Sequence, residues 1–354
     1  MAGSAALAVE LAEELTGSFL EREPRYLWTD AFAVCNCLAL ARASDDARWL
    51  TRALELVERV HRALGRHRPD DPRTGWLSGL PEREGDAHPT RGGLRIGKPL
   101  PERRRDEPFD ERLEWERDGQ YFHYLTQWMH ALHQVASAAR EPRFDEWARE
   151  LAAVAHGAFL VRPPGAPPRM VWKMSVDLQR ALVPSMGQHD PLDGYVICLE
   201  LGGVELAAAR ADFAAMLARC ELRTADPLGL GVLLADAHRL AQLAERGVRD
   251  GERWLPPLVA AAAAGLQQQE RLGEIRLPAS RRLAFRELGL AIGLAATRRS
   301  ARLAALDRYA PLGDALVAFW REGAHRANTT WAEHRDINEV MLATALVPDG
   351  YLEL

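Results

Sequence analysis

The chain has 354 residues, of which 47% are hydrophobic and 27% are charged, and its formal net charge at pH 7 is −5. This balance predicts a folded globule and excludes the strongly basic surface with which nucleic-acid-binding proteins contact phosphates. No run of 18 apolar residues occurs, and the N-terminal MAGSAALAVELAEEL carries acids where a signal peptide has basic residues. We therefore expect a cytosolic protein, with neither nucleic acid nor a membrane as its partner.

Helix-length segments of two kinds alternate along the chain. The segments 45–64 and 142–160 repeat apolar residues at steps of three and four and keep one polar face, which is typical of an outer helix. By contrast, 30–41 and 191–201 are apolar nearly all round and need neighbours on every side. The other predicted helices are 3–16, 118–138, 204–221, 227–245, 252–270, 279–297, 300–321 and 334–346.

Twelve helices that alternate in this way predict an all-α fold in which six helical hairpins close into a ring, an (α/α)6 toroid. No linker rich in Ser, Gly or Pro divides the chain, so we expect a single domain over 1–354. Residues 65–117 interrupt the pattern, and they mix glycine with apolar residues such as Trp76, Leu80 and Leu94. We interpret this insertion as an ordered lid or rim loop at the mouth of the ring, with a flexible insertion as the alternative.

Polar clusters open the apolar helices and would gather at one mouth of such a ring. They are Trp28–Asp30, Asp118–Tyr124, Gln188–Gly194, Asp226–Gly229, Ser280–Arg282 and His334–Glu339. Within 118–138 a face with Tyr121, Tyr124 and Trp128 adjoins a face with amides and His123. A sugar needs such a surface, because its C–H faces stack on rings and its hydroxyls need hydrogen-bond partners. The alternative is a core helix whose polar groups satisfy one another.

Aspartate precedes proline at Asp190 and at Asp226, which is typical of a helix N-cap. Capping is the preferred interpretation for Asp226. At Asp190 the glycine-containing approach and the nearby Asp193 also favour a carboxylate that faces a cavity and can orient an attacking water.

Only two of the 45 basic residues are lysine, Lys98 and Lys173, and both stand in irregular segments beside polar clusters. A compact ammonium is not interchangeable with a guanidinium, so a functional role is one interpretation and chance is the other. The segment from Trp172 to Arg180 offers an aromatic ring, a cation and the acid Asp177, as expected of a site loop.

The four cysteines lie inside helical patterns without the CxxC or Cys-His spacing of a zinc site. We expect buried, reduced thiols, no structural metal and no cofactor.

The alternation of helices over nearly all of 1–350 resembles the six-hairpin (α/α)6 toroids of glycosidases and of the N-acylglucosamine 2-epimerase group. The resemblance is architectural, and no family motif transfers residue by residue. It implies a funnel at the N-termini of the inner helices that binds a carbohydrate or a similar polyol.

Glycoside hydrolysis by paired carboxylates is the function expected first. The expected catalytic residues are Asp118 and Asp190, with Glu114 and Glu339 as substitutes and His189 beside them. One alternative is a sugar isomerase or epimerase in which His123, His189 or His334 moves a proton. Another is a sugar-binding or scaffold protein without catalysis.

The C-terminal cluster has its own prediction, since closing the ring would bring His334 and Asn338 to Trp28 and Asp30. There they would either line the pocket or only latch the ring shut. The full set expected to bind substrate is Trp28, Asp30, Tyr121, His123, Tyr124, Trp128, Trp172, Lys173, Asp177, Gln188, Asp193, His334 and Asn338. The sequence does not determine the oligomeric state.

Overall fold

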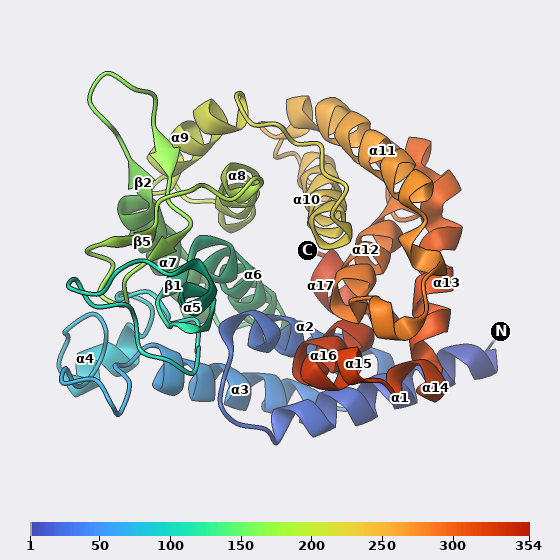
Figure 1. Cartoon of the computed structure of the whole chain (residues 1–354), viewed down its shortest axis with the longest axis horizontal. Helices are drawn as coiled ribbons and strands as arrows, with labels where there is room; N and C mark the ends of the chain where they lie inside the picture. Colours follow the sequence, from blue (N-terminus) through green and yellow to red (C-terminus); the bar gives the residue numbers. More distant parts are fainter. Residues whose placement is uncertain (1) are drawn as a thin grey trace. The chain divides into compact units, whose positions relative to one another are not determined.

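The computed structural model describes residues 2–354, with side chains from residue 6 onward, and the chain is mostly helical (Figure 1). Helices hold 65% of the residues and strands 4%, in agreement with the all-α class. No helix among the described residues is both long and apolar enough to span a membrane. The contacts divide the chain into two compact units, unit 1 (1–21, 35–49 and 221–354) and unit 2 (22–34 and 50–220).

Unit 1 is built almost entirely from helices, which pack mainly on the central helices α10 and α12. Its elements are α1 (Ala2–Leu20), the second part of α2 (Leu27–Ser44), α10 (Pro227–Glu245), the 3-10 turn Glu252–Trp254, α11 (Leu255–Leu272), the 3-10 turns Glu274–Arg276 and Ala279–Arg281, α12 (Ala284–Thr297), the 3-10 helix Ala301–Tyr309, α13 (Ala310–Arg321), α14 (Gly323–Arg326), α15 (Thr329–Glu333), α16 (Arg335–Leu346) and α17 (Asp349–Leu352).

Unit 2 combines helices with short antiparallel strands. Its elements are the first part of α2, most of α3 (Arg48–Leu64), α4 (Glu82–Ala87), α5 (Glu111–Glu116), β1 (Gln120–Tyr121), α6 (Phe122–Ala139), α7 (Arg143–Phe159), β2 (Leu160–Val161), β3 (Arg169–Met170), β4 (Lys173–Met174), β5 (Ala181–Val183), α8 (Asp190–Leu201) and α9 (Ala207–Leu217). Strand β4 pairs with β1 and with β5, and β2 pairs with β3.

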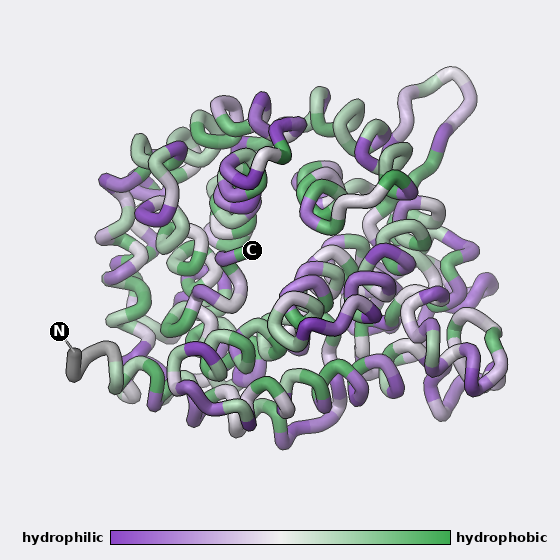
Figure 2. The backbone as a smooth tube through the Cα atoms, turned by 180° about the vertical axis from the view of Figure 1, so that it is seen from behind, coloured by the Kyte–Doolittle hydropathy of each residue, from purple (hydrophilic) through white to green (hydrophobic). Residues whose placement is uncertain are grey.

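The two predicted kinds of helix are both present. Every residue of α8 is buried, while α7 buries residues at helical spacing and leaves Arg143 and Glu146 exposed. In unit 2, α6 packs on α7 and on α8, and α8 packs on α9. Alternating hydrophobic and hydrophilic residues along the helical coils are visible in Figure 2. Burial of a whole helix surface explains why the 191–201 segment carries no polar stripe.

All twelve predicted helices are confirmed, and three of them begin four or more residues later than expected. Residues 118–121 are extended and 279–283 hold a 3-10 turn, while 301–309 form a 3-10 helix ahead of α13. The strands were not predicted from the sequence, because two- and three-residue strands have too few residues to show a period of two. The cap at Asp226 is confirmed, since its carboxylate accepts the Gly229 N–H at 2.8 Å.

The 65–117 insertion is folded into unit 2 through its apolar residues. Trp76, Leu94 and Ile96 are almost completely buried, whereas Phe109 is 54% exposed. The insertion therefore has an anchored first part and a more exposed second part. The four cysteines are free thiols, and three of them are buried.

Acid should destabilise the protein through buried His61. Burial lowers the pKa of His61 to about 3, and its Nε2 accepts the Trp128 indole N–H at 3.1 Å. An unfolded histidine titrates near ~6.5, so this contribution to stability is complete above that pH and is lost as the pH falls toward 3. Between pH 6 and pH 5, His61 should account for a loss of about 1 kcal/mol in the free energy of unfolding.

Urea unfolding at both pH values tests this prediction with two variants. His61→Gln should show the smaller loss between pH 6 and 5. Trp128→Phe, which keeps the imidazole, should lower stability at both pH values and keep the wild-type pH dependence. Equal pH dependence in wild type and His61→Gln would contradict the assignment.

Candidate functional site

Residues 94–97 of the insertion run as an extended segment between three other parts of unit 2. The Arg95 N–H donates to the Leu64 carbonyl at 2.9 Å, and the Ile96 N–H donates to the Gly119 carbonyl at 2.8 Å. On the other side, the Ile96 carbonyl accepts the Leu27 N–H at 3.0 Å. This segment joins the C-terminus of α3, the N-terminus of α2 and the residue before β1, so its backbone fixes how these three parts meet.

Asp118, two residues before β1, holds this segment in place. Its side chain is completely buried, and its carboxylate lies 2.5 Å from the Arg95 guanidinium and 3.7 Å from that of Arg68. The same carboxylate accepts the backbone N–H groups of Gly97 at 3.0 Å and Gly119 at 3.1 Å. A carboxylate that accepts this many hydrogen bonds is better suited to hold the fold together than to transfer a proton, so we assign Asp118 a structural role.

Gly97 is required by this geometry. Its φ is +93°, and a Cβ placed there would lie 2.2 Å from the Arg25 carbonyl oxygen. Only glycine tolerates both the left-handed backbone and the close approach.

An aromatic cluster covers the head of α6 (Phe122–Ala139). Its rings come from the α2 approach, α5, β1, α6 and the segment before β4, and they form a continuous set of ring contacts. The members of the aromatic cluster are Tyr26, Trp115, Tyr121, His123, Tyr124 and Trp172.

Parallel rings form the centre of the aromatic cluster. Trp172 stacks on Tyr121 with centroids 4.9 Å apart, and His123 is almost parallel to Trp172 at 6.0 Å and 8°. Trp115 meets Trp172 edge-on at 5.0 Å and is 48% exposed. Since Trp172 and His123 are half-buried, part of this aromatic surface is open to solvent.

The polar atoms of the cluster are uncharged at neutral pH. The hydroxyls of Tyr26 and Tyr124 are 2.5 Å apart, and burial raises the pKa of Tyr26 to about 12 and that of Tyr124 well above its usual value. Burial lowers the pKa of His123 to about 4, and its Nδ1 is buried with no hydrogen-bond partner among the described residues. The site thus offers phenol donors beside a neutral imidazole.

The two lysines of the chain flank this cluster. Lys98 Nζ lies over the Tyr26 ring and Lys173 Nζ over the Tyr121 ring, each 5.4 Å from the centroid. Burial lowers the pKa of Lys98, and the carboxylates of Glu116 and Asp118 oppose that shift. The sequence had marked both lysines as unusual, and the structure brings them to one site.

The two ammonium groups differ in their contacts. Lys173 is completely buried and donates to the carbonyls of Glu114 at 2.7 Å and Arg117 at 2.8 Å, with the Glu114 carboxylate 3.0 Å away. The Glu114 carboxylate also pairs with Arg103 at 2.9 Å, so it is engaged by two cations. Lys98 is half-buried, and its Nζ has no hydrogen bond or ion pair within the described part of the chain.

Asp190 is the first residue of α8 and does not cap that helix. His189 occupies the N-cap position, and the Asp190 carboxylate instead accepts the N–H of Gly187 at 3.0 Å. The expected cap at Asp190 is therefore wrong, because the helix begins one residue earlier than the Asp-Pro pattern implies. Burial raises the pKa of Asp190 to about 7, so this carboxyl group can carry a proton at neutral pH.

The other predicted residues of unit 2 lie apart from the ring contacts of the aromatic cluster. Asp30 pairs with Arg25 at 3.2 Å, and burial raises the pKa of Asp30 to about 7. The Trp28 ring lies 4.5 Å from the Phe32 ring and is tilted by 46° to it, and Trp128 is a core residue that donates a hydrogen bond to His61. Around α8, Asp193 is buried, His189 is half-buried and Gln188 is exposed.

The C-terminal cluster belongs to unit 1. Exposed His334 meets the Phe285 ring edge-on at 5.6 Å, while buried Asn338 accepts the Phe285 N–H at 2.9 Å. Glu339 pairs with Arg335 at 2.8 Å. The predicted approach of His334 and Asn338 to Trp28 and Asp30 stays a prediction.

Tyr26 and Trp115 complete the cluster but were absent from the sequence-based set. Tyr26 precedes the predicted helix 30–41, and Trp115 lies in the irregular insertion, so helical periodicity gave no signal for either. The only local signal at Trp115 is that a large aromatic residue stands between two acids, Glu114 and Glu116.

No protein-family model matches the chain, and a search of curated proteins found no similar sequence. Among the described residues, no group of three or more His, Cys, Asp or Glu side chains is placed to hold a metal ion.

The contrast between the two lysines should appear in their reactivity. Lys98 should be acylated by a limiting N-hydroxysuccinimide ester at least about tenfold faster than Lys173, because only an uncharged, accessible amine reacts. Peptide mass spectrometry on the native protein measures both sites, and the denatured protein, in which the rates should converge, is the control. Faster native labelling of Lys173 would contradict the assigned contacts.

Proposed function

We propose that the protein is a carbohydrate-active enzyme whose aromatic cluster binds a sugar. The observation that carries the proposal is the half-buried stack of Trp172 and His123 on Tyr121, bordered by the hydroxyls of Tyr26 and Tyr124. Aromatic faces bury sugar C–H groups, and phenol hydroxyls both donate to and accept from sugar hydroxyls.

Proton transfer is the chemistry that this cluster supports best. His123 is neutral above about pH 4, as its lowered pKa requires, so its imidazole can accept a proton from a carbon beside a sugar carbonyl. The protonated Tyr26 and Tyr124 pair supplies donors for the negative charge that develops on the carbonyl oxygen. This assignment favours a sugar isomerase or epimerase.

Hydrolysis of a glycosidic bond is the second candidate. It needs one protonated acid and one free carboxylate, and at the aromatic cluster Glu114 and Asp118 are both engaged by cations. Asp190 favours this alternative, because a pKa raised to about 7 suits a general acid.

The six-hairpin (α/α)6 architecture belongs to the same proposal. Neighbouring helices pack as pairs within each unit, as in α6 with α7, α8 with α9, and α12 with α13, which supports the predicted hairpins. A cytosolic location and a small-molecule or oligosaccharide substrate are further parts of the proposal, and they follow from the composition and from this site chemistry.

Deuterium uptake from heavy water separates these functions. Incubating the protein with a panel of aldoses, ketoses and N-acylated hexosamines should exchange one carbon-bound proton of the true substrate, as read by proton NMR. His123→Ala should lower the exchange rate by at least ~10²-fold, the usual effect of losing a general base. Trp172→Ala should raise KM by at least about tenfold through the lost ring contact.

His156→Ala is the matched control, because half-buried His156 lies in the same unit but pairs with Asp212 at 2.8 Å. It should keep wild-type exchange. A parallel panel of aryl glycosides and oligosaccharides tests the second candidate: turnover there that is lost in Asp190→Asn, without any deuterium uptake, would replace isomerisation by hydrolysis. Sugar binding that is unchanged in Trp172→Ala would remove the aromatic cluster from either function.

A further inference from the structure

A cavity of about 250 Å³ lies in unit 2 between the insertion and the β4–β5 hairpin. Arginine dominates its wall, and none of its lining residues belongs to the aromatic cluster. The residues that line this arginine pocket are Arg73, Glu102, Arg103, Arg104, Arg105, Ser175, Asp177 and Arg180. Five guanidinium groups face two carboxylates here, although the whole chain is negatively charged.

Two of these arginines are neutralised within the fold. Arg73 pairs with Asp71 and with Glu102, both at 2.8 Å, and with Asp177 at 3.2 Å. Arg103 pairs with Glu114 at 2.9 Å. These ion pairs form part of the pocket wall. The neighbouring carboxylates balance the positive charges of Arg73 and Arg103, so these two side chains attract an anionic ligand only weakly.

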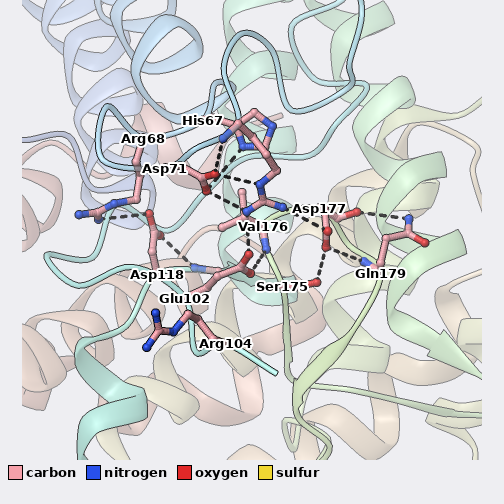
Figure 3. A network of polar contacts seen from close by, with 12 residues as sticks. His67, Arg68, Asp71, Glu102, Arg104, Asp118, Ser175, Val176, Asp177 and Gln179 are labelled. Carbon is pink, nitrogen blue, oxygen red and sulfur yellow. Dashed lines mark hydrogen bonds and ion pairs between the residues drawn. The ribbon is translucent and has the colours of Figure 1, made fainter. Parts of the chain in front are cut away.

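The other three arginines carry the excess positive charge. Arg105 and Arg180 form no ion pair within the described part of the chain, and Arg180 donates to the Arg103 carbonyl. Arg104 is 75% exposed and lies 3.6 Å or more from its two acidic neighbours. In Figure 3, no dashed line joins the guanidinium of Arg104 to the network beside it.

The carboxylates of the pocket are held in fixed positions. Glu102 accepts the Val176 N–H at 2.7 Å in addition to its pair with Arg73. Asp177 accepts the Ser175 hydroxyl at 2.6 Å and the Gln179 N–H at 3.1 Å. Figure 3 shows these acids joined in one network, so the wall is arranged before any ligand arrives.

We propose that the arginine pocket binds the phosphate group of a small phosphorylated metabolite. A guanidinium fork matches phosphate oxygens in a bidentate way, and a dianion suits three arginines that lack close ion pairs better than a single carboxylate does. The volume of about 250 Å³ equals roughly eight water molecules at ~30 Å³ each, which leaves room for a small organic part beside the phosphate. This site does not depend on the proposed sugar chemistry.

Isothermal titration calorimetry of the full chain tests the pocket with four probes: glucose 6-phosphate, glucose, inorganic phosphate and sulfate. Glucose 6-phosphate should bind, glucose should not compete for it, and added salt should weaken the binding. The double variant Arg104→Gln/Arg105→Gln should raise the Kd by at least about tenfold, since each lost charge-assisted hydrogen bond has that order of effect. Both side chains are exposed, so the variant should fold.

Arg112→Gln is the matched control, because Arg112 is an exposed arginine of α5 outside the pocket and should leave the Kd unchanged. Inorganic phosphate binding as tightly as the sugar phosphate, with the same dependence on Arg104 and Arg105, would support the pocket and make free phosphate its ligand. Binding of neither phosphate probe, or binding unaffected by the double variant, would overturn the proposal. Trp172→Ala should leave phosphate binding intact, so failure of the sugar site and failure of this pocket are separable.

Discussion

The buried carboxylate of Asp118 is the constraint on which unit 2 depends. A charge that is removed from water is tolerated only where several donors replace its hydration. Here Arg95, Arg68 and the N–H groups of Gly97 and Gly119 fill that role. Arg68, Arg95 and Gly97 come from the insertion, whereas Gly119 is the next residue in the chain. Removing one partner of such a buried pair costs roughly 3–5 kcal/mol.

The aromatic cluster adjoins this carboxylate, and a second buried carboxylate, Glu114, links the cluster to the arginine pocket. On one side Lys98 directly follows Gly97, and Tyr121 lies two residues after Gly119, so both the ammonium and the central ring stand close to contacts of the Asp118 carboxylate. On the other side Glu114 joins Lys173 under the aromatic cluster to Arg103 in the arginine pocket. The contacts of Glu114 with Lys173 and with Arg103 therefore link the aromatic surface to the cationic cavity.

The sequence predicted the helices well and the site in part. Helical periodicity located α3, α7 and α8 to within a few residues, because each has a regular pattern of burial. The rarity of lysine pointed to Lys98 and Lys173 without any structural information. The sequence did not show that the Asp118 carboxylate pairs with the Arg95 guanidinium, since that contact depends on how the irregular insertion folds back. The arginine pocket was not predicted from the sequence for the same reason, because no periodicity links residues 73, 103–105 and 180.

Backbone hydrogen exchange in Asp118→Asn tests the central claim most directly, with Asp212→Asn as a control for loss of a surface carboxylate that pairs with His156 and Arg162. If Asp118 anchors the insertion, the amides of Arg95, Ile96 and Gly97 should exchange at least ~10²-fold faster in Asp118→Asn, as a loss of roughly 3 kcal/mol implies. The control should leave them unchanged. Wild-type protection of these amides in Asp118→Asn would contradict the account.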